Sequence, residues 1–149
     1  MISSLSFSAI AHATEDPEKV KKAMLNLLPK DLRTSITISQ TAAKGHHGNP
    51  ITLLNFDINE PESAKATFNY IICSLPDVEV SQIRSQLNLY YDGRSAIFLR
   101  IDKQSAYLGS LRLSLSDDVI KLRVNFVRGD PSSIFDTLST LNFERNFHH

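Results

Sequence analysis

The sequence predicts an α+β protein, with a mainly antiparallel sheet and helices packed on one face, in a single domain that spans residues 1–149. A length of 149 residues fits one domain. The chain is 42% hydrophobic and 21% charged, which is typical of a globular protein that builds its core without disulfides or metals. The expected strands and helices also lack the regular β-α alternation of a parallel sheet, which favours antiparallel pairing.

The first element expected is a strand over residues 4–12, because its side chains alternate between two kinds. The face expected to be buried consists of Leu5, Phe7, Ala9 and Ala11, and the other face of Ser4, Ser6, Ser8, Ile10 and His12. A strand with one apolar side and one side of small polar groups indicates a sheet that is open on one face.

Helix signals follow this strand at Asp16-Pro17-Glu18, where a capping carboxylate precedes a proline and an acidic first turn. Apolar residues then recur at helical spacing until Pro29. Strands are expected next over residues 34–42 and 51–58. Pro61-Glu62 opens a second helix, and a shorter third helix follows Pro76.

The last third of the chain predicts four strands and one helix. The strands are expected over residues 89–91, 96–101, 111–115 and 119–126. Asp92-Gly93 is typical of a hairpin turn between the first two. Asp130-Pro131 repeats the capping arrangement and opens a final helix with Ile134, Leu138 and Leu141 inward.

Charge and cysteine content limit the classes of function. Lys+Arg and Asp+Glu number 16 each, so any nucleic-acid site must be a local patch. Cys73 is the only cysteine and lies in an apolar helical stretch, which excludes an intrachain disulfide and favours a buried thiol. We expect a cytoplasmic protein without a membrane segment, since the start of the chain lacks a signal peptide pattern. The terminal pair His148-His149 can also be a tag remnant and is left out of the functional reasoning.

The loop at residues 44–50 is the most distinctive candidate site. It consists of Lys44, Gly45, His46, His47, Gly48, Asn49 and Pro50. Free glycine amides would cradle a phosphate, the lysine would add charge, and the histidines would stack on bases or donate to phosphate. The alternative is a solvated turn between two strands.

A second candidate site lies at the end of the 96–101 strand. Phe98 and Arg100 share the face opposite Ile97 and Leu99, and an aromatic ring beside a guanidinium suits stacking and phosphate contact. The following Lys103 and Gln104 would extend this contact, unless the cations are simply paired with carboxylates.

Two weaker patterns accompany these candidates. His12 stands at a strand end, next to acidic residues that capping already explains. Lys121, Arg123 and Asn125 alternate with apolar residues, which indicates either a basic stripe on the open sheet face or an ordinary polar face. No metal is expected, because a cysteine pair and ligand spacings of known metal sites are absent, and no cofactor motif is present.

Several of these segments, in this order along the chain, resemble one family. They are His12-Ala13-Thr14-Glu15-Asp16 with Lys19-Val20, the loop Gly45-His46-His47-Gly48-Asn49-Pro50, Leu99-Arg100-Ile101-Asp102-Lys103-Gln104, and Asp117-Asp118-Val119-Ile120. The family consists of small archaeal proteins described as RNA-binding and as predicted exosome-associated subunits. The resemblance implies a fold like that of the fifth large-subunit ribosomal protein, archaeal cytoplasm, and partners in RNA processing or translation, including exosome-associated or ribosome-associated proteins.

The leading hypothesis is a non-catalytic RNA-binding module. Its contacts are expected from His12, Lys44, Gly45, His46, His47, Gly48, Asn49, Arg100, Lys103 and Gln104, gathered into one local electropositive surface. Structured RNA is favoured over a long single strand, because tryptophan is absent and aromatic residues make up only 8%. The alternatives are a protein–protein adaptor that docks a partner on the open sheet face, and a metal-independent nuclease that uses His12, His46 or His47 with Asp102.

Overall fold

A five-stranded sheet in the order β2-β3-β1-β5-β4 forms the centre of the computed structural model, and every neighbouring pair of strands is antiparallel. The strands are β1 (Ile2–Ala11), β2 (Ser39–Lys44), β3 (Pro50–Ile58), β4 (Ala96–Asp102) and β5 (Val119–Phe126). The structure describes the backbone of residues 1–148 and the side chains of residues 1–141, so the side chains of His148-His149 lie outside it. The predicted class, a single α+β domain with an antiparallel sheet, is confirmed.

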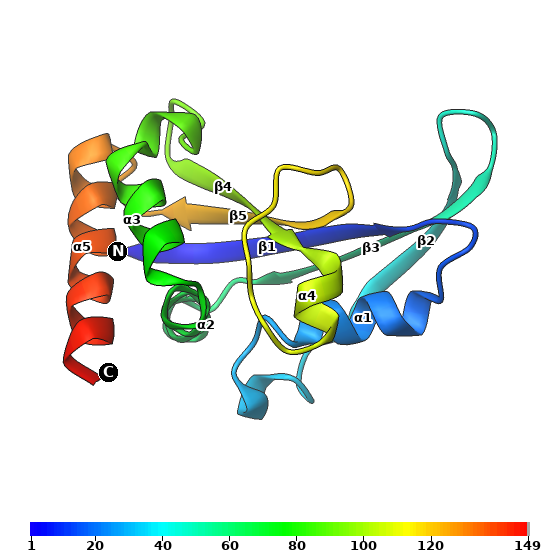
Figure 1. Ribbon diagram of the computed structural model, residues 1–149, viewed down its shortest axis with the longest axis horizontal. Helices are drawn as coiled ribbons and strands as arrows, with labels where there is room; N and C mark the ends of the chain where they lie inside the picture. Colours follow the sequence, from blue (N-terminus) through cyan, green and yellow to red (C-terminus); the bar gives the residue numbers. More distant parts are fainter. Residues whose placement is uncertain (149) are drawn as a thin grey trace.

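Five helices accompany the sheet. They are α1 (Pro17–Leu25), α2 (Pro61–Ser74), α3 (Asp77–Ser85), α4 (Lys103–Tyr107) and α5 (Pro131–His148), with the short 3-10 helices η1 (Lys30–Leu32) and η2 (Leu87–Leu89). Helices α1, α2 and α4 lie along one side of the sheet, whereas α3 and α5 pack together near the N-terminus (Figure 1). None of the described helices has the length and apolar character needed to cross a bilayer.

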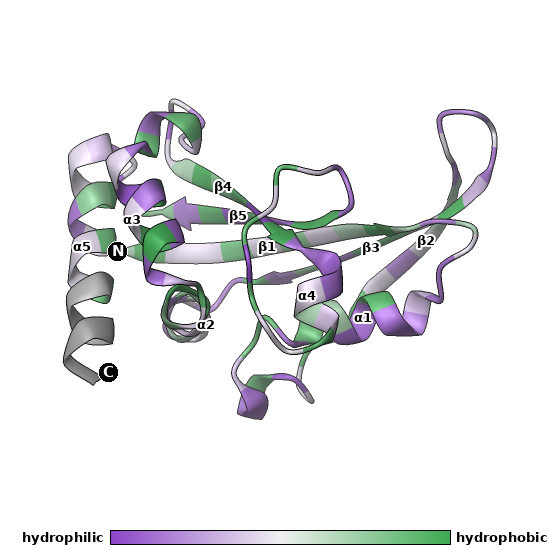
Figure 2. Cartoon of the chain, viewed as in Figure 1, coloured by the Kyte–Doolittle hydropathy of each residue, from purple (hydrophilic) through white to green (hydrophobic). Residues whose placement is uncertain are grey.

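The alternation predicted for β1 determines which side of the sheet is buried. Leu5 and Phe7 are fully buried between the sheet and the helices, and the Phe7 ring stacks on Phe56 of β3 at 4.5 Å between centroids. Figure 2 shows the resulting contrast between the hydrophobic stretches of the central strands and the hydrophilic end of the β2–β3 hairpin. The other side of the sheet, called the open face below, carries Ser6, Ser8, Ile10, Leu53, Asn55, Asp57, Phe98, Arg100, Lys121, Arg123 and Asn125, all half-buried or exposed.

Both predicted aspartate-proline helix starts are confirmed. The Asp16 carboxylate accepts a hydrogen bond from the Glu18 amide at 3.0 Å, and Asp130 accepts one from the Ser133 amide at 3.1 Å. These side chains satisfy amides that the first turn of a helix leaves without an intrahelical partner. The start of α2 at Pro61 is confirmed as well.

Four sequence predictions of secondary structure are wrong or incomplete. The strand expected over residues 34–42 begins at Ser39 and runs to Lys44, because its register follows the pairing with β3. The segments 89–91 and 111–115 each contribute only a single bridge to β4, at Tyr91 and Leu113. Helix α4 was not predicted, since its five residues are too short to show a helical period.

Candidate functional site

The predicted Gly-His loop is the tight tip of the β2–β3 hairpin. The Gly45 amide donates to the Asn49 carbonyl at 2.6 Å, and the Gly48 amide donates to the Gly45 carbonyl at 2.9 Å. Gly48 has a φ of +80°, a conformation that favours glycine. Both glycine amides are thus used within the turn, so the phosphate cradle expected from free amides at these positions is not formed.

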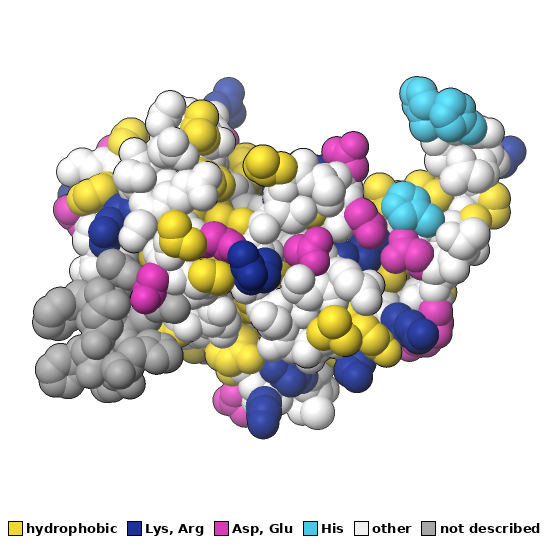
Figure 3. Space-filling model, in the orientation of Figure 1, with side chains coloured by type: hydrophobic (Ala, Val, Ile, Leu, Met, Phe, Trp, Pro, Cys, Tyr) yellow, Lys and Arg dark blue, Asp and Glu magenta, His cyan; other side chains and the backbone are white. Residues whose placement is uncertain are grey.

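The side chains of the hairpin tip remain accessible. His46, His47 and Asn49 are exposed, and the two imidazole rings meet edge to face at 5.0 Å. Lys44 is also exposed and makes no ion pair with any described residue. Figure 3 shows histidines at the end of this hairpin, projecting from the body of the molecule.

Lys103 is buried, contrary to the surface role expected for it. Its side chain is 7% exposed, and its ammonium donates to the carbonyl of Ile10 at 2.7 Å and to Glu15 at 3.1 Å, and pairs with Asp118. Burying an ammonium costs free energy that only close partners offset. The ammonium therefore ties the end of β1 to the start of β5, and it offers no free charge to a phosphate.

The residues around Lys103 do not form a free cationic surface. His12 is half-exposed, and its Nε2 lies 3.8 Å from carboxylate oxygens of both Glu15 and Asp118. Gln104 lines a hollow between α1 and α4 with Tyr107, on the helix side of the sheet. The predicted single electropositive surface is not found, because the carboxylates of Glu15 and Asp118 pair with Lys103.

His12, Glu15 and Asp118 also place ligand atoms within 4.8 Å of one another. The Lys103 ammonium already occupies the position between the two carboxylates. Among the described residues this cluster thus binds an internal cation, and no metal site is inferred from it.

The geometry expected for a nuclease is also not assembled around Asp102. Its carboxylate accepts hydrogen bonds from the Ser105 amide at 2.9 Å and the Ser105 hydroxyl at 2.7 Å, which caps α4. His12 contacts Glu15 and Asp118 instead. Asp102 thus has a structural role at a helix start.

Arg100 keeps its predicted place on the open face. The register of the sheet puts it directly opposite Lys121 of β5, and Lys121 in turn lies opposite Ser8 of β1. Arg100 donates to the Ser116 carbonyl at 2.7 Å and to Asp117 at 3.4 Å. Lys121 is exposed and has no ion pair with a described residue.

The neighbouring cross-strand pair on the open face also contains a cation. Arg123 lies opposite Phe98, and its guanidinium stands 5.1 Å from the centre of the Phe98 ring. Arg123 also contacts Asp92 at 3.4 Å and Asn125 at 2.8 Å. Arg100, Lys121 and Arg123 together are called the basic stripe below. The face of the molecule drawn in Figure 3 carries acidic and basic side chains interspersed with one another.

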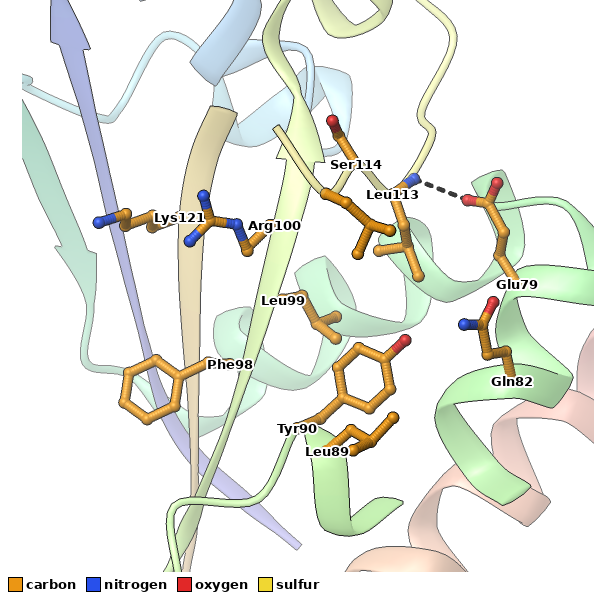
Figure 4. A pocket seen from close by; sticks show the side chains of 11 residues that line it. Glu79, Gln82, Leu89, Tyr90, Phe98, Leu99, Arg100, Leu113, Ser114 and Lys121 are labelled. Atoms are coloured by element: carbon orange, nitrogen blue, oxygen red, sulfur yellow. Dashed lines mark hydrogen bonds between the residues drawn. The ribbon is translucent and has the colours of Figure 1, made fainter. Parts of the chain in front are cut away.

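Two hollows flank the basic stripe. One, of about 600 Å³, lies along the outer edge of β4 and includes Phe98, Arg100 and Lys121 (Figure 4). The other, of about 520 Å³, lies over β1 and β3 and includes Ile10, Asn55 and again Lys121. Lys121 therefore stands on the ridge between two concave surfaces.

The sequence pattern marks Lys121 and Arg123 as polar residues of a strand but does not single them out as site residues. Their alternation with apolar residues was visible, yet it also fits an ordinary outer face. What favours a site is their position opposite Arg100 and Phe98, and this depends on the β4–β5 register. No feature within one strand reveals that register.

Comparison with known protein families identifies one match. A family model described as RNA binding matches residues 4–126. The curated protein MJ0213 of Methanocaldococcus jannaschii is 34% identical over 129 residues, which cover 85% of each chain. The protein of Pyrococcus abyssi named RNA-binding protein PAB1135 is 29% identical over 114 residues, which cover 76% of this chain and 74% of that protein.

Solved structures agree with the fold described above. Protein AF2318 from Archaeoglobus fulgidus superposes with a TM-score of 0.80 at 29% identity, over 95% of this chain and 99% of that one. Protein SSO0741 from Sulfolobus solfataricus gives a TM-score of 0.78 at 27% identity, over 95% and 98% of the two chains. Both are described with the family-model name DUF54.

Proposed function

Because the chain belongs to the RNA-binding family whose model matches residues 4–126, we propose that it is a non-catalytic RNA-binding module that holds phosphates on the open face of β4 and β5. Structured RNA of the processing or translation machinery is the proposed partner. The relative from Pyrococcus abyssi, whose name describes it as RNA-binding, supports this assignment.

One observation carries the choice of surface: two cations, Arg100 and Lys121, lie directly opposite each other on neighbouring strands. Like charges at such positions destabilise a sheet. Asp117 offsets only the Arg100 guanidinium, and Lys121 has no acidic partner among the described side chains. A phosphate between the two side chains would remove this repulsion and gain charge-assisted hydrogen bonds.

The hairpin tip supplies a second proposed contact. Lys44, His46, His47 and Asn49 are exposed at its end, and the hairpin projects beyond the sheet (Figure 1). An RNA helix on the open face could be touched by these side chains through its sugar and phosphate groups. The glycines would then serve by shaping the turn.

Charge-removing variants test the proposed surface. We expect Lys121→Ala and Arg123→Ala each to weaken binding to a structured RNA several-fold, with similar losses across RNA sequences, as is typical of lost phosphate contacts. Lys65→Ala is the matched control, since Lys65 is an exposed lysine on α2, which packs on the other face of the sheet. Equal losses in all three variants, or none, would argue against this surface.

A protein partner is the second candidate for the open face. Ile10 and Leu53 pair across β1 and β3, and each is 39% exposed. If the face served only as a protein interface, Ile10→Ser would abolish association with that partner while the basic-stripe variants left RNA affinity unchanged.

A further inference from the structure

The 600 Å³ hollow beside the basic stripe is walled by residues from four parts of the chain. Tyr90 and Leu89 come from the η2 region, Glu79 and Gln82 from α3, and Leu113 and Leu115 from the irregular segment after α4; Phe98, Leu99, Arg100 and Lys121 come from the sheet. Figure 4 shows the Tyr90 ring between the β4 edge and α3, with Leu113 above it and Arg100 and Lys121 on the opposite side. This volume suits a ligand of nucleotide size.

The floor of the hollow contains a stretch of the β4 edge where backbone hydrogen bonding to a neighbouring segment is interrupted. The Phe98 amide donates to the Tyr90 carbonyl at 2.8 Å, and the Arg100 carbonyl accepts from the Ser114 amide at 2.9 Å. The amide and carbonyl of one strand residue point to the same side. The Phe98 carbonyl and the Arg100 amide therefore also point outward, and no described residue bonds to either of them on this edge.

The hollow has a further polar group in Tyr90. Its hydroxyl has no hydrogen bond to a described residue, and burial together with the nearby Glu79 carboxylate raises its pKa, so it stays protonated at neutral pH. The Glu79 carboxylate itself is occupied, because it accepts from Leu113 at 2.6 Å and from Arg112 at 3.0 Å. A ligand would therefore meet a neutral donor at Tyr90.

We propose that this hollow receives one unpaired nucleobase of a structured RNA, with an adjoining phosphate on Lys121 and Arg100. The apolar side chains Leu89, Leu113 and Leu115 would cover the faces of the base. The Phe98 carbonyl, the Arg100 amide and the Tyr90 hydroxyl would meet donors and acceptors on its edges. The inference rests on the proposed function, since it names the feature of RNA that the same surface selects.

A stem RNA with a single bulged nucleotide tests this inference against two matched RNAs. One has an abasic ribose at the bulge and therefore the same number of phosphates, and the other is fully paired. We expect the bulged RNA to bind about tenfold more tightly than the abasic RNA, as is typical for one base held by protein side chains. Tyr90→Ala should reduce its affinity to that of the abasic RNA, whereas Lys121→Ala should weaken both RNAs alike.

Leu89→Ala provides a second variant, in case Tyr90→Ala perturbs folding. Leu89 is 68% exposed, and Leu108→Ala is its control, because Leu108 is 72% exposed and lies outside the hollow. Equal affinity for bulged, abasic and paired RNA, unchanged by Tyr90→Ala and Leu89→Ala, would overturn the base pocket and leave RNA binding intact. Failure to bind any of the three RNAs would overturn the proposed function as well.

Discussion

Lys103 has a structural role that differs from the phosphate contact expected from its place in the sequence. In the sequence it follows a strand with an exposed arginine, which predicts a phosphate contact. In the structure its ammonium joins Ile10, Glu15 and Asp118. Glu15 lies 88 positions from Lys103 in the sequence, and Ile10 lies 93 positions from it. Nothing local in the sequence therefore predicts the burial of Lys103.

Lys103→Ala is therefore expected to lower stability. Removing the ammonium leaves two carboxylates and a carbonyl without their donor, at a cost of about 1–3 kcal/mol. The free energy of unfolding in urea measures the loss, and Lys65→Ala, an exposed change, should stay within about 0.5 kcal/mol of the wild type. If Lys103→Ala kept full stability and weakened RNA binding, the direct phosphate contact that the sequence predicts for Lys103 would be supported instead.

Asp92 predicts a dependence of stability on pH. Its carboxylate accepts hydrogen bonds from the amides of Ala96, Arg94 and Ser95, and together with Arg123 these hold its pKa below the usual 3.8. A pKa that is lower in the folded state stabilises the fold above the unfolded value, and this contribution is lost as the pH falls through the folded value.

Asp92→Ala should consequently reduce the difference in stability between pH 7 and pH 3. Urea unfolding at both pH values measures this difference. Asp31→Ala is the control, since Asp31 is an exposed carboxylate without a hydrogen bond to a described residue. If Asp92→Ala retained the full difference seen in the wild type, the hydrogen bonds of this turn would not account for it.

At the tip of the β2–β3 hairpin, Gly48 has a structural role, whereas His46 and His47 have a proposed role in binding. Gly48→Ala should destabilise the protein by about 1 kcal/mol, because a side chain is strained at its φ of +80°. The double variant His46→Ala/His47→Ala should keep the stability of the wild type and weaken RNA binding, since both rings are exposed at the tip. Unfolding and RNA titrations of the two variants distinguish these roles, and unchanged RNA affinity of the histidine variant would exclude the tip from the interface.

Elements were predictable from sequence where the signal lies within the element. The alternation of β1, β4 and β5, the strand at β3 and the aspartate-proline starts of α1 and α5 were identified correctly. The segments 89–91 and 111–115 have apolar residues like a strand, but each touches the β4 edge at one bridge only. Their conformation depends on packing against β4 and α3, which a short sequence window cannot show.

The candidate site was predictable to a lesser extent for the same reason. Residue type and turn chemistry suggested Arg100 and the hairpin side chains, and the structure places them on the open face and at an exposed hairpin tip. The opposition of Arg100 and Lys121 depends on strand register, and the hollow beside them depends on segments far apart in sequence. Sequence therefore proposed residue types for a site, and only the assembled sheet shows which of them share a surface.

At the scale of the whole molecule, the net charge of zero limits how strongly the RNA affinity should depend on salt concentration. The chain carries 16 basic and 16 acidic residues, so attraction has to be local, and the proposed function assigns it to the basic stripe and Lys44. With roughly 0.7–0.9 counterions released per phosphate contact, up to four such contacts predict a slope of log affinity against log salt of about −3. Titrations between low and physiological salt measure it, and a slope near zero would exclude phosphate contact as the main source of affinity.

The buried ammonium of Lys103 also bears on the order of folding events. It connects Ile10 of β1 with Asp118 before β5, which are far apart in the sequence, so we expect it to form late in the assembly of the sheet. Interactions that form after the transition state slow unfolding and leave the folding rate nearly unchanged. The lifetime of the native protein would then depend on one positive charge at the end of the sheet where β1, β4 and β5 meet.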